Sequence, residues 1–211
     1  MKSLKRDVIL SSICGEITSW FLILVIKNPY VKEFGGLVKM ESLIWVLPIV
    51  LPIFFVAGTL IGRVVSRLFG IISQIVKFLE IGVLNTFIDL GILNFSVGLS
   101  GVTSGLGLAP LNTFSFLCAA TNSYYWNKFW TFSASAQGYG GQGKRGVFLQ
   151  FLFISVIGWG INTGIVVLGT TFMSPLAALS AGAWINVVKL AATFVSMVWN
   201  FLGYKFIVFK K

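Results

Sequence analysis

The chain has 211 residues, of which 56% are hydrophobic and 10% are charged, and its mean hydropathy is +0.91. Soluble domains contain about a quarter charged residues, so this composition excludes a water-soluble protein and indicates one that is integral to a membrane. Lys and Arg outnumber Asp and Glu by 16 to 6 but lie in short clusters between apolar runs, which favours contact with anionic lipids and argues against nucleic acid as a partner.

Six apolar segments are long enough to cross a hydrocarbon core, which takes about twenty residues. They cover residues 8–26, 43–62, 78–99, 108–126, 147–173 and 183–204. Because the backbone finds no water partner in lipid, each segment is expected to be a helix. The predicted fold class is therefore an all-α integral membrane protein with six transmembrane helices, the second of them kinked by Pro48 and Pro52.

The distribution of basic residues predicts the orientation, since Lys and Arg favour cytoplasmic loops. One set of helix ends holds Lys2, Lys5, Arg6, Arg63, Arg67, Lys77, Lys128, Lys144, Arg145, Lys205, Lys210 and Lys211. The other set holds only Lys27, Lys32 and Lys39, and the links near 100–107 and 174–182 carry no charge. We therefore expect a multi-pass protein of the cytoplasmic membrane with both termini in the cytoplasm.

Two motifs recur at the same distance along the chain. Asn85-Thr86 is repeated as Asn162-Thr163, and the segment 128–132 (KFWTF) is repeated in similar form at 205–209 (KFIVF), both 77 residues later. A shared offset indicates two duplicated helical hairpins, 75–133 and 147–210, inserted the same way up. Parallel repeats of this kind can build a transporter around a site at the repeat interface.

The Lys-Phe-x-x-Phe segments allow two readings. A cation among aromatic rings at a helix end is a common anchor in the headgroup layer. Alternatively, Lys128 and Lys205 form part of a functional basic ring at the cytoplasmic face. Glu80 lies one turn beyond Lys77 and is expected to compensate that basic ring.

Four charged residues lie inside the predicted spans, where a charge is costly and therefore a functional candidate. They are Glu16, Glu80, Asp89 and Lys189. At 1.5 Å per residue, Asp89 lies about 18 Å and Lys189 about 24 Å from the cytoplasmic ends of their helices, so the two side chains can meet. Such a pair either fixes the helices structurally or has a functional role.

Amide side chains also occur in or at the spans. They include Asn85, Asn112, Asn122, Asn162, Asn186 and Asn200. Amides in membranes usually bond across helices, and the same groups can hydrogen-bond a polar substrate. We take Asn85, Asn122, Asn162 and Asn200, together with Asp89, Lys189, Lys128 and Lys205, as the candidate substrate-binding residues.

The motifs from residue 77 onward resemble the GtrA-like family of membrane proteins. The first is Lys77-Phe78-x-x-x-Gly82-x-x-Asn85-Thr86-x-x-Asp89, and the second is residues 122–132, NSYYWNKFWTF. The third joins residues 189–193, KLAAT, to residues 199–206, WNFLGYKF. The resemblance implies a four-helix domain over 75–211, to which residues 1–70 add a transmembrane hairpin. The second hairpin departs from the first, with Trp159 and Val166 in the places of Gly82 and Asp89.

What the resemblance implies about function is passage of a polyprenyl-phosphate-linked monosaccharide across the membrane for surface polysaccharide or glycan synthesis. Lys189, Lys128 and Lys205 would then attract the phosphate of this lipid, and the amides would hydrogen-bond its sugar hydroxyls. A non-transporting anchor or partner subunit of a glycosyltransferase is the alternative, and an ion-coupled small-molecule transporter using Glu16 or Asp89 is a second one. A glycosyltransferase and a second copy of the chain are candidate protein partners.

The residues available for chemistry argue against an enzyme. The chain contains no His, and Cys14 and Cys118 both lie in apolar runs, so a catalytic pair, a disulfide framework and a His-based metal site are not expected. No nucleotide-binding motif is present in the sequence. We expect no cofactor, with any transport running downhill or driven by other proteins.

The charge count generates a topology prediction. Reporter fusions at the C-terminus and in the 133–146 linker should be cytoplasmic, and one in the 174–182 link should be external, because basic loops stay inside. Paired alkaline phosphatase and fluorescent-protein fusions measure this, and an external C-terminus would contradict the predicted topology.

Overall fold

The computed structural model describes residues 2–34, 44–68, 72–131 and 144–203, and every regular element within them is helical. The long helices are α1 (Lys2–Ile26), α4 (Leu47–Val65), α5 (Ile72–Ser100), α6 (Leu108–Trp126), α7 (Lys144–Phe172) and α8 (Ala181–Gly203). The short ones are η1 (Lys32–Phe34), the π-helical turn η2 (Asn127–Thr131) and η3 (Leu176–Ala178). The predicted all-α class is confirmed, and each predicted span lies on one long helix.

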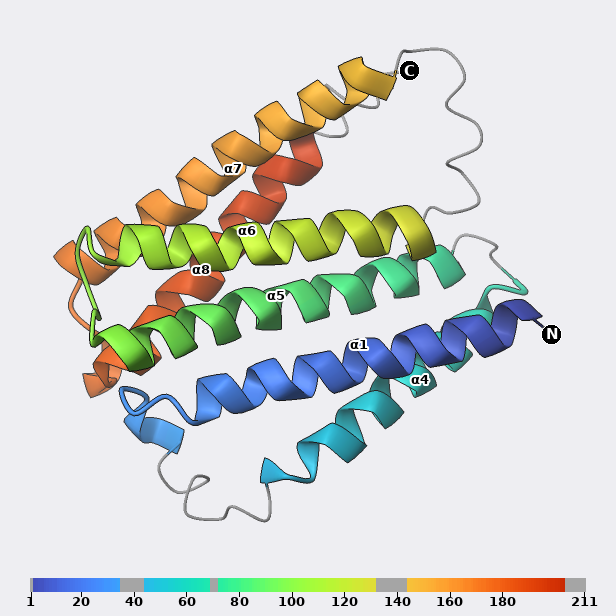
Figure 1. Cartoon of the computed structure of the whole chain (residues 1–211), viewed down its shortest axis with the longest axis horizontal. Helices are drawn as coiled ribbons and strands as arrows, with labels where there is room; N and C mark the ends of the chain where they lie inside the picture. The colour runs from blue at the N-terminus through green and yellow to red at the C-terminus, as the bar shows by residue number, and fades with distance from the viewer. Residues whose placement is uncertain (1, 35–43, 69–71, 132–143, 204–211) are drawn as a thin grey trace.

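The helices lie side by side with α5 in the middle of the bundle (Figure 1). Helix α5 packs against α1, α4 and α6 and touches α8, while α7 packs mainly against α8. The α5–α6 and α7–α8 hairpins meet near their connecting loops, and α7 rises away from α6 towards the opposite end (Figure 1). The chain thus forms two hairpins that diverge, with α1 and α4 against the far side of α5.

Within the described residues, four of the six long helices, α1, α4, α7 and α8, are long and apolar enough to cross a membrane. Their outward faces carry large exposed hydrophobic side chains, such as Phe54 on α4 at 68% exposure, which suits contact with lipid. Helices α5 and α6 have 29 and 19 residues but include the polar side chains that the bundle buries. The chain is therefore a multi-pass membrane protein. The predicted number of six spans stays a prediction.

Close backbone approaches hold α1 against its neighbours. A Cβ on Gly15 would lie 2.6 Å from the Pro52 Cα of α4, and one on Gly91 of α5 would lie 2.7 Å from the Phe21 carbonyl oxygen of α1. Small residues permit this tight packing, on which helix association in lipid depends. Pro52 lies inside α4. The kink that it was expected to cause stays a prediction.

The segment after α1 is tied to the start of α8. Gly182 N donates to the Tyr30 carbonyl at 2.8 Å, and a Cβ on Gly182 would overlap that carbonyl. Glu33 accepts from the Ser180 amide at 2.7 Å and from its hydroxyl, and these hydrogen bonds lower the pKa of the Glu33 carboxyl. The N-terminal hairpin therefore contacts both α5 and the α7–α8 hairpin.

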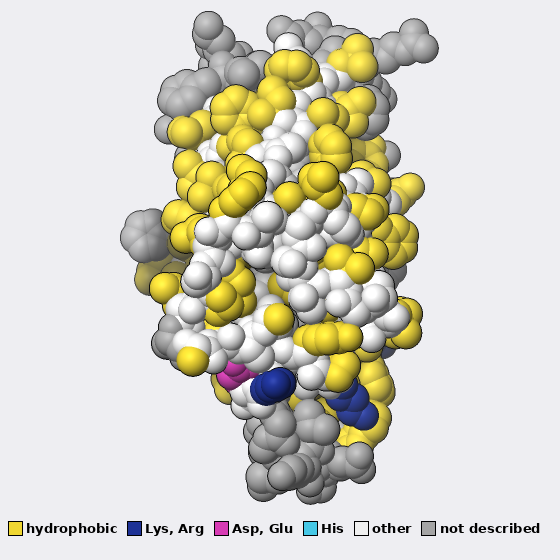
Figure 2. All heavy atoms as spheres, turned by 90° about the vertical axis from the view of Figure 1, so that its left-hand side faces the viewer, with side chains coloured by type: hydrophobic (Ala, Val, Ile, Leu, Met, Phe, Trp, Pro, Cys, Tyr) yellow, Lys and Arg dark blue, Asp and Glu magenta, His cyan; other side chains and the backbone are white. Residues whose placement is uncertain are grey.

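The loop end of the bundle bears few charges. On the face shown in Figure 2, acidic and basic side chains gather in one small region, and the remaining described surface is hydrophobic or uncharged. This agrees with the uncharged α5–α6 and α7–α8 links.

The packing of α1 on α5 predicts the effect of a methyl group at Gly91. Gly91→Ala should lower stability by about 1–3 kcal/mol, because the Cβ has to displace Phe21. Gly160→Ala on α7 is the matched control, since nothing lies within 4 Å of its Cβ and alanine favours the helix by up to about 1 kcal/mol. Thermal unfolding in detergent measures both, and equal midpoints would contradict the packing argument.

Candidate functional site

The centre of the four-helix domain is the ammonium group of Lys189, a fully buried side chain on α8. Its Nζ lies 2.7 Å from Asp89 Oδ2 of α5, 2.6 Å from Asn112 Oδ1 of α6 and 2.9 Å from Asn162 Oδ1 of α7. Each acceptor comes from a different helix, and a lysine ammonium has three N–H donors. The side chain therefore joins all four helices of the domain at one point.

The acceptors around Lys189 are themselves hydrogen-bonded. Ser115 Oγ donates to Asp89 Oδ1 at 2.6 Å, and Asn112 Nδ2 donates to Asn162 Oδ1 at 3.1 Å and to Thr163 Oγ1 at 3.0 Å. Asn162 Nδ2 lies 3.5 Å from Ser196 Oγ. A network satisfied in this way fixes helix positions, because losing one member leaves a buried polar group unpaired.

The predicted contact between Asp89 and Lys189 is confirmed. With three acceptors already at Nζ, the ammonium has no further N–H for a phosphate in this conformation. A phosphate would have to replace at least one of the acceptors. The observed geometry is thus that of a structural pair, and a substrate role for these two residues stays a prediction.

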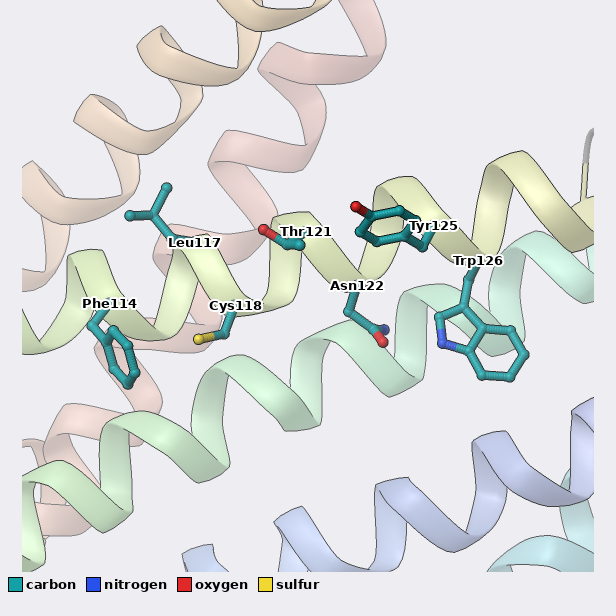
Figure 3. A pocket seen from close by; sticks show the side chains of 7 residues that line it. All are labelled: Phe114, Leu117, Cys118, Thr121, Asn122, Tyr125 and Trp126. Carbon is teal, nitrogen blue, oxygen red and sulfur yellow. The ribbon is translucent and has the colours of Figure 1, made fainter.

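A second amide pair joins α5 to α6. Asn122 Nδ2 donates to Asn85 Oδ1 at 2.7 Å, and both side chains are half-buried. Asn122 also faces a groove of about 590 Å³ on the outer side of α6 (Figure 3). The groove is lined by Phe114, Leu117, Cys118, Thr121, Asn122, Tyr125 and Trp126.

A charged cluster near the start of α5 was not predicted from the sequence. Asp7 Oδ1 of α1 accepts from Lys77 Nζ at 2.7 Å and from Trp130 Nε1 at 2.9 Å, while Arg63 of α4 lies 3.8 Å from Oδ2. Arg6 donates to the Phe129 carbonyl of η2. The signal in the sequence that could have indicated this cluster was Asp7, an acidic residue at a helix end in a set of helix ends that is otherwise rich in Lys and Arg.

Glu80 is hydrogen-bonded to hydroxyl groups and does not form the expected pair with Lys77. It is buried between helices and accepts from Ser11 Oγ of α1 at 2.8 Å and from Thr59 Oγ1 of α4 at 2.9 Å. Lys77, the nearest residue of the expected basic ring, is paired with Asp7 instead. Glu80 thus attaches the N-terminal hairpin to α5 through hydroxyl donors.

Amide pairing across helices was expected of Asn186, but its partners were not. Asn94 Nδ2 of α5 donates to Asn186 Oδ1 of α8 at 2.6 Å, and Asn28 Nδ2 donates to Asn94 Oδ1 at 2.6 Å. This chain of amides connects the segment that follows α1 to α5 and α8. Asn28 and Asn94 are visible in the sequence. The sequence does not show which sides of the helices face one another, and the contacts depend on that.

Three candidate residues fall where the structure gives no account of them. Lys205 lies outside the described residues, and the side chains of Lys128, within η2, and Asn200, within α8, lie outside the described part as well. The basic ring that Lys128 and Lys205 were expected to form stays a prediction.

The comparisons with known proteins give one result. A family model described as GtrA/DPMS, transmembrane domain, matches residues 77–209. The match begins at Lys77 and covers α5 to α8, the helices that surround Lys189. Neither a curated protein nor a solved structure matches the chain.

The network at Lys189 predicts the outcome of removing either charge. Lys189→Met or Asp89→Asn should each destabilise the fold by about 3–5 kcal/mol. Lys189→Met leaves the Asp89 carboxylate buried without its cation, and Asp89→Asn leaves the Lys189 ammonium buried without its anion. The double variant should recover most of the folded yield. Glu16→Gln is the control, since the glutamine still accepts from Trp20 Nε1. Fluorescence-detected size-exclusion chromatography measures yield, and parental yield in both single variants would contradict the network's structural role.

Proposed function

Because the chain belongs to the GtrA/DPMS transmembrane-domain family, we propose that it moves a polyprenyl-phosphate-linked monosaccharide across the cytoplasmic membrane. The family match over α5 to α8 is the observation that carries this proposal. Domains of this family are associated with polyprenyl-linked sugars. That this chain flips such a lipid is our proposal.

The arrangement of the two hairpins supports movement of an amphiphile. They meet at Lys189 and diverge towards the end where α6 stops and α7 begins (Figure 1). A groove on α6 combines apolar side chains with an amide, a hydroxyl and a phenol. An amphiphilic substrate needs such a path, with polar groups for the sugar and apolar surface for the lipid chain.

The proposed topology places all six long helices across the bilayer. Helices α5 and α6 pack within the bundle beside spanning helices and bury their polar side chains against these neighbours. The divergent ends of the hairpins, with their Lys and Arg, then face the cytoplasm. Translocation in this scheme involves no catalytic step.

A partner subunit of a glycosyltransferase is the second candidate. The bonding of Lys189 supports this candidate, because an ammonium whose three donors are already used within the bundle fixes the helices without contacting a substrate. A cytoplasmic enzyme would then dock at the divergent ends. Transport by the purified chain alone separates the two functions.

The experiment is reconstitution of the purified chain in vesicles with a radiolabelled polyprenyl-phosphate-linked hexose, scored by its exposure to an impermeant reagent. Flipping should be accelerated over protein-free vesicles. An unchanged rate, together with co-purification of a glycosyltransferase, would replace the transport function by the partner function.

The Asp89→Asn/Lys189→Met double variant tests whether the buried pair takes part in this transport. If Lys189 exchanges its acceptors for the substrate phosphate, transport by correctly folded double variant should fall by about 10- to 100-fold, the worth of a hydrogen bond to a charged group. Full transport with normal yield would leave the pair a purely structural element.

A further inference from the structure

The groove on α6 changes in polarity along its length. The half nearer the start of the helix is apolar and consists of Phe114, Leu117 and Cys118. The half nearer its end is polar and consists of Thr121, Asn122 and Tyr125, closed by Trp126. Twelve helical residues span about 18 Å, comparable to the hydrocarbon thickness of one leaflet.

The groove is bordered by two rows of side chains. In Figure 3 the side chains of Phe114, Cys118, Asn122 and Trp126 point towards α5, and those of Leu117, Thr121 and Tyr125 point to the opposite side. The space between these two rows follows the axis of α6. An extended hydrocarbon chain that lies in this space would contact the side chains of both rows.

The polar half is unsuited to hydrocarbon. Tyr125 is 54% exposed, Thr121 is exposed, and Asn122 is half-buried against Asn85. Hydrocarbon offers no hydrogen-bond partner to groups on a lipid-facing surface. A headgroup rich in hydroxyls supplies such partners where a hydrocarbon chain does not.

Beyond Tyr125 the surface continues into an aromatic stack and a cation. The Tyr125 and Phe129 rings are stacked with centroids 6.2 Å apart, and exposed Arg6 donates to the Phe129 carbonyl. Arginine suits phosphate through its planar set of donors. The order along the surface is thus apolar, hydroxyl-bearing and cationic.

We propose that the α6 groove holds one prenyl-type chain lengthwise, with its sugar phosphate at Asn122 and Tyr125 beside Arg6. The chemical identity of this occupant rests on the proposed function, while the groove and its direction rest on the residues above. The site differs from the Lys189 network and takes up the substrate before any rearrangement at that network.

Cys118 provides a direct readout of occupancy, because it lines the groove while Cys14 is fully buried. The Cys14→Ala variant in nanodiscs is treated with N-ethylmaleimide, with or without a farnesyl-phosphate-linked hexose. The probe should slow labelling of Cys118 about tenfold at saturation, and farnesol or added phosphatidylglycerol should not. Equal labelling with and without the sugar lipid would overturn the proposal, as would equal protection by phosphatidylglycerol.

Two further variants fix the position of the occupant. Leu117→Trp fills the groove and should abolish protection of Cys118, whereas Leu168→Trp on α7 is matched in exposure, 57% against 55%, and should leave it unchanged. Tyr125→Phe keeps the stack on Phe129 but should weaken the sugar lipid about two- to tenfold, the worth of one hydrogen bond. Parental affinity in both Leu117→Trp and Tyr125→Phe would contradict the assigned position.

Failure of this inference and failure of the transport function give different results. Parental flipping by Leu117→Trp would reject the groove and retain transport. Protection of Cys118 that Leu117→Trp abolishes, in a protein that does not flip the lipid, would retain the groove and reject transport.

Discussion

The constraint on which the four-helix domain depends is the burial of one ammonium group in lipid. A lysine inside a membrane protein has to find acceptors for its donors, since neither water nor hydrocarbon supplies them there. Lys189 finds three, one each from α5, α6 and α7. Helices that would otherwise associate through weak packing are thereby held in one register, and the point at which the two hairpins meet follows from it.

The hydrogen bond between Lys189 and Asn112 is related to the predicted repeat. Asn112 and Lys189 are 77 residues apart, the offset at which Asn85-Thr86 is repeated as Asn162-Thr163, and they hydrogen-bond to each other. If the hairpins are copies, equivalent positions on α6 and α8 face one another across their interface. One position then carries the cation and the other an amide that accepts from it, as sites at repeat interfaces commonly require.

Sequence reasoning found the class of protein, the six helices and the Asp89–Lys189 pair, because composition and depth along a helix are both readable from residue spacing. It did not find the acceptors Asn112 and Asn162 at Lys189, or Asn94 between Asn28 and Asn186. Those contacts depend on how each helix is rotated about its axis, which packing decides. Asp7 was missed for a related reason, since its partners Lys77 and Trp130 come from elements distant in sequence.

The N-terminal hairpin lies outside the family match, yet its contacts favour divergence of the core hairpins at one end only. Near the loops, Tyr30 and Glu33 bind the start of α8, while Asn28 reaches Asn94 of α5. At the other end, Asp7 and Arg6 bind Lys77, Trp130 and the Phe129 carbonyl, which belong to α5 and η2. The described contacts thus join the N-terminal hairpin to both core hairpins at the loop end and to the first core hairpin at the divergent end. Separation of α7 and α8 from α6 at the divergent end leaves these attachments intact, whereas separation at the loop end has to break them.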